Sequence, residues 1–233
     1  MADAIRFSII SIMHRLSKTQ IKWSSNFAYA IGLIVTDGCL YNDGRHVDFT
    51  SKDKELVLKF RECLGIQSKI GIKYRGGDKY KKLKYFRVQL GDVNFYDFLL
   101  SIGLGPRKSR SLGSLEIPRK FFTDFLRGCI DGDGSIGFYN HPESKHPQLR
   151  VRICSASLNF LKWLKREVKE VTGINSGWID EVKNSIPVLC YAKADSIILL
   201  SALYKNPNCV CLLRKREVVK KFYGRVAELG IRA

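Results

Sequence analysis

The sequence predicts an α+β fold that is built twice from the same pattern of helices and strands. Two segments 96 residues apart, 27–38 and 123–134, are apolar runs that end in Asp-Gly. Each is followed by a segment that alternates apolar and polar residues, 45–51 and 148–155, as half-buried strands do. Short strands that occur as hairpins favour antiparallel sheets covered by helices on one face.

The remaining elements follow in the same order in both halves. After each alternating segment comes a helical pattern that ends near a glycine, a common helix stop. Two further strands and another helix complete each half, so the predicted order is helix, two strands, helix, two strands, helix. The expected helices are 54–64, 94–102, 158–171 and 197–204, and the expected strands are 69–74, 84–90, 178–182 and 188–193.

The repeats divide the chain into four parts. We predict an N-terminal extension at 1–25, a first repeat at 26–102, a linker at 103–118 and a second repeat at 119–233. The linker is assigned from its content of Gly, Pro, Ser and basic residues.

Composition limits the possible functions. The 233 residues include 40 Lys and Arg but 22 Asp and Glu, a net charge of +18, which favours a nucleic-acid partner. The longest apolar run is far shorter than the ~20 residues of a bilayer span, so no membrane partner is expected. Seven cysteines without CxxC spacing, and no secretory signal, predict reduced thiols in an intracellular protein.

Glycines inside the two repeated helices predict that these helices pack closely. Gly32 and Gly128 each cost ~1 kcal/mol relative to alanine in a helix, a cost accepted where a second backbone must approach. Such a pair of helices would bring Asp37 and Asp133 out together at the same end. The glycine after each aspartate would let the chain turn sharply away.

The chemistry of paired aspartates at helix ends favours a hard cation. Helix C-termini are electronegative and expose carbonyl oxygens, and Mg²⁺ prefers oxygen ligands. A lone acid at a helix end is usually structural, but the matched pair favours a site for divalent ions, which support phosphodiester hydrolysis. A calcium-loop interpretation of 131–135 fails, because Ile136 and Pro142 stand where an EF-hand needs Gly and Glu.

The segments 30–38 and 126–134 resemble the LAGLIDADG motif of homing endonucleases, present twice as in the monomeric members of that family. The resemblance implies two αββαββα halves related by a pseudo-twofold axis. The motif helices would form the interface, and the two antiparallel sheets would form a DNA-binding saddle. Residues 211–216 also resemble the end of such a repeat.

The resemblance implies which residues hold the metal. The last acid of each motif is the ligand, which gives Asp37 and Asp133, with the backbone carbonyls of Thr36 and Gly132 in support. Asp131 has no acidic counterpart in the first motif, where Val35 stands, so we expect it not to be required for metal binding but to act at the helix end or behind the metal ligands. The implied cofactor is Mg²⁺, for which Mn²⁺ or Ca²⁺ would substitute in binding.

Family members also place a basic or amide side chain on a late strand, where it organises water near the cut phosphate. Gln89 and Lys193 are the catalytic candidates of this kind. The implied protein is a monomeric, intron-encoded, Mg²⁺-dependent endonuclease that cuts both strands of a long asymmetric DNA target. The alternative is an RNA-binding intron maturase, with intron RNA as partner, or a DNA-binding regulator on the same scaffold.

Strand alternation predicts the DNA-facing side chains. Val47 and Phe49 would face the helices, and the residues between them would face DNA. The three tryptophans are expected in the core. The candidate DNA-binding residues are Arg45, His46, Asp48, Thr50, Lys73, Arg75, Lys79, Lys81, Lys82, Lys84, Arg87, Arg150, Arg152 and Lys183.

Overall fold

A computed structural model describes residues 17–75, 83–140, 147–183 and 185–228, so the candidates Lys79, Lys81 and Lys82 lie outside the described residues. The first half contains, in chain order, α1 (Ser25–Asp37), β1 (Gly38–Leu40), β2 (His46–Ser51), α2 (Lys54–Cys63), β3 (Ile70–Arg75), β4 (Leu83–Gly91), α3 (Val93–Ser101) and α4 (Lys108–Ser111).

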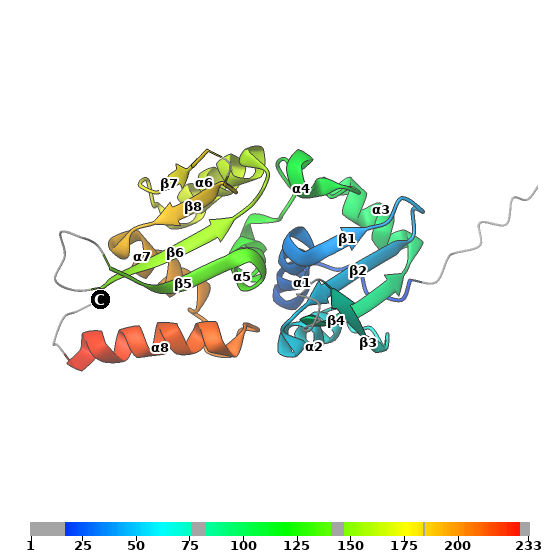
Figure 1. Cartoon of the computed structure of the whole chain (residues 1–233), viewed down its shortest axis with the longest axis horizontal. Coiled ribbons are helices and arrows are strands. Elements are labelled where there is room, and N and C mark those ends of the chain that lie inside the picture. The colour runs from blue at the N-terminus through cyan, green and yellow to red at the C-terminus, as the bar shows by residue number, and fades with distance from the viewer. Residues whose placement is uncertain (1–16, 76–82, 141–146, 184, 229–233) are drawn as a thin grey trace, which may run out of the picture.

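The second half repeats this order (Figure 1). Its elements are η1 (Arg119–Phe121), α5 (Phe122–Asp133), β5 (Gly134–Tyr139), β6 (Gln148–Cys154), α6 (Leu158–Thr172), β7 (Trp178–Asp180), β8 (Val188–Tyr191), α7 (Lys193–Leu203) and α8 (Leu213–Glu228). None of the helices described has the length and apolar character that a bilayer span requires.

Each half holds one four-stranded antiparallel sheet. The strand orders are β1-β2-β4-β3 and β5-β6-β8-β7, and the registers correspond, with Gly38 opposite Phe49 and Gly134 opposite Ile153. In the first half α2 and α3 pack on the sheet, and in the second α6 and α7 do so. The predicted α+β fold of two repeated halves is confirmed.

Some predicted elements differ from the structure. Strands β1 and β5 begin at the glycine of each Asp-Gly pair and were not located individually, because a short glycine-containing strand carries little pattern. Strand β8 ends at Tyr191, so Lys193 lies in α7 and the prediction that it sits on a late strand is wrong. The linker also contains a short helix, α4.

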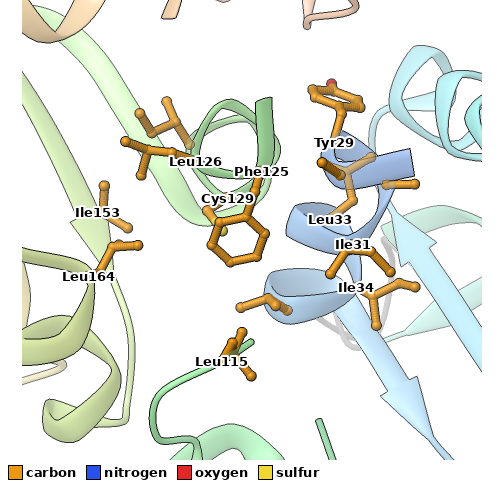
Figure 2. Close-up of a cluster of buried hydrophobic side chains, with 14 of the residues drawn as sticks. Tyr29, Ile31, Leu33, Ile34, Leu115, Phe125, Leu126, Cys129, Ile153 and Leu164 are labelled. Atoms are coloured by element: carbon orange, nitrogen blue, oxygen red, sulfur yellow. The ribbon is translucent and has the colours of Figure 1, made fainter. Parts of the chain in front are cut away.

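The two motif helices, α1 and α5, lie side by side between the sheets (Figure 1). A Cβ atom on Gly32 would lie 2.2 Å from the Phe125 carbonyl oxygen, and one on Gly128 would lie 2.2 Å from that of Tyr29. The helices therefore cross with their backbones in contact, as the glycines predict. Figure 2 shows the apolar side chains around this crossing, with Leu33 on α1 facing α5.

Candidate functional site

The ends of the two motif helices meet at their C-terminal turns. A Cβ atom on Gly132 would lie 2.0 Å from Thr36 Oγ1, so the Thr36 side chain rests directly on the Gly132 backbone. Asp37 and Asp133 are the next residues and the last of α1 and α5. The structure thus brings these two predicted site residues to neighbouring helix ends, together with Thr36 and Gly132.

The protein around the two carboxylates makes their negative charge unfavourable. Burial, and then the charge of Asp133, raises the pKa of Asp37 to about 6. Burial also raises the pKa of Asp133. The positive charges of Lys108 and Lys215 lower the pKa of both carboxyl groups, against the effect of burial. The arrangement holds acids that a nearby cation would stabilise in their charged form.

These charges predict a pH-dependent stability. The folded protein binds a proton on Asp37 more tightly than the unfolded chain, so its stability falls as pH rises from about 4 to about 6. The penalty above that window is up to about 3 kcal/mol. In chelator, Asp37→Asn should raise the melting temperature at pH 7.5 and have little effect at pH 4, measured by calorimetry.

Asp43→Asn is the matched control with the opposite sign. Hydrogen bonds from His46 lower the pKa of Asp43 to about 2, so its charged form supports the fold above pH 4. This variant should lower the melting temperature at pH 7.5. A melting temperature for Asp37→Asn that stays below the wild-type value at pH 7.5 would contradict the account of the site.

Two buried lysines bind the helix ends, one in each half of the chain: Lys108 at the end of α1 and Lys215 at the end of α5. Lys108 Nζ donates to the Gly38 carbonyl oxygen at 2.5 Å. Lys215 Nζ donates to the carbonyl oxygens of Gly134 at 2.7 Å and Asp131 at 3.0 Å, and also to that of Ile130. Burial lowers the pKa of Lys108, and lowers that of Lys215 to about 8.

The sequence indicates Lys108 and Lys215 only as candidates for contact with DNA phosphates and does not predict that they bind the ends of the motif helices. The signal was an Arg-Lys pair at the end of each repeat, at 107–108 and 214–215, which the repeat comparison did not align. The first pair follows α3 and the second pair follows α7, which are equivalent helices of the two repeats. An alignment of the repeats extended past these helices would have matched the two Arg-Lys pairs.

The Asp131 side chain is buried and accepts hydrogen bonds that hold α5 in place. Its side chain is 1 % exposed, and Oδ2 accepts hydrogen bonds from the Tyr29 hydroxyl at 2.8 Å and the Leu212 amide at 2.7 Å. These contacts tie α5 to α1 of the first repeat and to the chain that precedes Lys215.

The donors at the helix ends suit a hard cation that retains water. Within the described ranges, no cluster of three His, Cys, Asp or Glu side chains could hold a metal. An ion would therefore depend on the two carboxylates, nearby carbonyl oxygens, water and a bound phosphate, which is a typical set for Mg²⁺. A cavity of about 200 Å³ lies beside Asp133, and its lining also includes Val35, Thr36, Lys108 and Cys154.

The other two catalytic candidates lie on β4 and at the start of α7. Gln89 is exposed on β4 and pairs with Asp48 of β2. Lys193 is exposed at the start of α7, and the sheet registers place it where the first repeat has Asp92. The two are therefore not equivalent positions of the repeats, and a catalytic role for either stays a prediction.

The uncovered faces of the two sheets carry most of the predicted DNA-binding residues. The inward positions of β6, such as Val151, are buried as predicted, and Asp48 on β2 is only 4 % exposed. Trp178 was expected in the core but is 41 % exposed, with the Arg150 guanidinium 5.9 Å from its ring centroid. The exposed or half-exposed candidates are Arg45, His46, Thr50, Lys73, Lys84, Arg87, Arg150, Arg152 and Lys183, and Arg75 ends β3.

Known proteins share this architecture. Residues 24–103 match the LAGLIDADG-like domain family. The homing endonuclease I-WcaI, bound to its DNA recognition sequence, is 14% identical with a TM-score of 0.59, over 82% of this chain and 85% of that one. The LAGLIDADG homing endonuclease I-LtrWI, bound to target DNA, is 13% identical with a TM-score of 0.57, over 88% and 91%.

The same fold occurs in full-length DUF199/WhiA from Thermatoga maritima, which is 17% identical with a TM-score of 0.54. That match covers 88% of this chain, but this chain spans only 62% of the length of WhiA. A comparison with curated proteins gave no match.

The chain therefore contains a LAGLIDADG-like domain and has the LAGLIDADG fold of two repeated halves. It resembles the monomeric double-motif LAGLIDADG homing endonucleases, as its two motifs predict.

Proposed function

We propose that this protein is a site-specific endonuclease that cuts both strands of a DNA target and requires a divalent cation, Mg²⁺ in the cell. The observation that carries the proposal is the meeting of Asp37 and Asp133 at the ends of two helices in backbone contact. A net charge of +18 and two uncovered sheet faces support a DNA partner.

The residues of the site have separate tasks in this proposal. Asp37 and Asp133 would hold the cation, with the carbonyl oxygens of Thr36 and Gly132 in support. Bound there, the cation would supply positive charge that stabilises the attacking and leaving oxygens of phosphodiester hydrolysis. Lys108 lines the cavity with Asp133 and has ammonium donors beyond the one bound to Gly38, so it would contact a phosphate oxygen.

Lys215 would act differently, as a positioning residue. Its three hydrogen bonds to backbone carbonyls use all three donors of the ammonium group. It would therefore fix the end of α5 and so the position of Asp133, without a donor left for DNA.

The two halves in one chain support a monomer that reads an asymmetric target, because the outer faces of the sheets carry different side chains. Major-groove recognition by such sheet faces is physically favourable, since a strand ribbon fits that groove. An intron location for the gene is proposed from the resemblance to homing endonucleases.

A binding protein on the same scaffold is the second candidate, either a DNA-binding regulator or an RNA-binding maturase. The match to DUF199/WhiA supports this candidate, because the LAGLIDADG fold is shared with that DNA-binding regulator. A binding protein would have no need of two adjacent carboxylates with raised pKa values.

A plasmid library with randomised inserts separates the two candidates. The full chain is incubated with the library in Mg²⁺ or in excess chelator, and linear products are sequenced. We expect cutting at one related set of sites in Mg²⁺ and none in chelator. Bound but uncut DNA in Mg²⁺ would favour the regulator, and tight binding to structured intron RNA without DNA cutting would favour the maturase.

A further inference from the structure

A buried carboxylate lies on the uncovered face of the first sheet. Asp48 alternates with the core residues Val47 and Phe49, so its side chain leaves the sheet on the side away from the helices. It is nevertheless only 4 % exposed, because polar side chains from β2, from β4 and from the loop after β1 cover it. Its Oδ1 accepts a hydrogen bond from Thr50 Oγ1 at 2.7 Å, and Oδ2 accepts one from the Tyr41 hydroxyl at 3.3 Å.

Arg87 on β4 completes this network. Its Nε donates to Asp48 Oδ2, and its Nη2 donates to the Tyr41 hydroxyl at 3.0 Å. Both contacts use one side of the planar guanidinium. Nη1 has no acceptor among the described residues, so the terminal edge, formed by Nη1 and the other Nη2 hydrogen, remains available. The side chain is 29% exposed.

The space beside Arg87 is open. The residue paired with it on β3 is Gly71, and a Cβ atom there would meet nothing closer than 4.0 Å. A planar group can therefore approach the guanidinium without meeting a neighbouring side chain at that position.

Among the residues that the structure describes, the second repeat has no equivalent network. The sheet registers place Arg152 where the first repeat has Asp48, and Val188 where it has Arg87. The position of Tyr41 is taken by glycine, at residue 137. The Asp48–Arg87–Tyr41 network is thus a feature of one half of the DNA-facing surface.

We propose that Arg87 reads a guanine in the major groove of the half-site bound by the first repeat, with Asp48 and Tyr41 as positioning residues. The terminal edge of a guanidinium matches the O6 and N7 acceptors of guanine, and a side chain held in place loses little freedom on binding. This inference rests on the DNA binding in the proposed function and adds a specificity determinant that cutting itself does not require.

The test uses binding rather than cutting. The full chain selects sites from a random double-stranded DNA library in Ca²⁺, and affinities are then measured for the selected site and for single base-pair changes. Each variant is scored by the ratio of its affinities for the two DNAs, because that ratio does not depend on how much of the preparation is folded.

We expect the wild type to require a G·C pair at one position of one half-site, by about 5- to 150-fold. Arg87→Ala should reduce this ratio to near one, and Asp48→Asn should reduce it partly. The double variant Asp48→Asn with Arg87→Gln removes both charges together and should also lose the preference for guanine. Lys73→Ala, on the same sheet, should weaken binding to both DNAs alike and leave the ratio unchanged.

A selected site whose guanine preference survives Arg87→Ala at every position would overturn the inference and leave the proposed function standing. Equal loss of the ratio in Lys73→Ala would also overturn it, since the effect would not belong to Arg87. Failure to select any DNA sequence would overturn this inference and the DNA-binding part of the proposed function together.

Discussion

Asp37→Asn and Asp133→Asn are each expected to lower DNA cutting by at least about 10³-fold while DNA binding stays within about threefold, a barrier increase of about 4 kcal/mol. The physical reason is that an amide keeps the shape of the side chain but loses the negative charge that would hold a cation at the helix end. Binding is retained because the sheet faces, not these acids, would contact the bases. The measurement is single-turnover cleavage of the selected site in Mg²⁺, with binding measured in Ca²⁺.

Asp97→Asn is the matched control for the two acid variants. The Asp97 side chain is exposed on α3, so its loss should change neither cutting nor binding. Wild-type cleavage by Asp37→Asn or by Asp133→Asn would show that the variant residue has no part in the reaction. Equal loss of cutting and binding would assign these acids to the fold instead.

Gly128→Ala is expected to destabilise the protein by about 3 kcal/mol, because the added methyl group would overlap the backbone of the other motif helix. Its Cβ would lie 2.2 Å from the Tyr29 carbonyl oxygen and 3.1 Å from the Gly32 Cα, and neither backbone atom can move without separating the helices. That separation would also part Asp37 from Asp133. The rate of DNA cutting should therefore fall by more than the loss of folded protein accounts for.

Gly224→Ala is the control for the same substitution in a helix. A Cβ on Gly224, in α8, would meet nothing within 4 Å, so alanine should stabilise the protein by up to about 1 kcal/mol. Chemical denaturation measures the change in unfolding free energy of each variant, which should be a decrease for Gly128→Ala and an increase for Gly224→Ala. A Gly128→Ala protein as stable as the wild type would contradict the close helix crossing.

The repeat and the helix crossing could be predicted from sequence because both depend on local pattern. The apolar run ending in Asp-Gly occurs twice at one spacing, and a helical glycine predicts close approach wherever the helix is buried. The pairing of Asp37 with Asp133 followed from these two facts.

The side chains that complete the site could not be predicted in the same way. Lys108 and Lys215 lie 70 and 81 residues from the glycines that they bind at the helix ends, and only the folded chain shows that a basic residue is buried there. Alternation placed Asp48 on the outer face correctly, but the pattern carries no information about a partner on another strand. Trp178 was assigned to the core from its apolar ring, and an edge strand left it exposed instead.

Localised oxidative cleavage of the polypeptide is the most direct measurement of whether a divalent ion sits at the ends of the two motif helices. Fe²⁺ replaces Mg²⁺ in the protein–DNA complex, ascorbate generates hydroxyl radicals at the bound ion, and the fragments are mapped by mass spectrometry. We predict cuts close to Asp37 and to Asp133 that Mg²⁺ suppresses and that Asp37→Asn and Asp133→Asn reduce. Cuts at other places in the chain, or cuts unchanged in both variants, would contradict a metal centre at these helix ends.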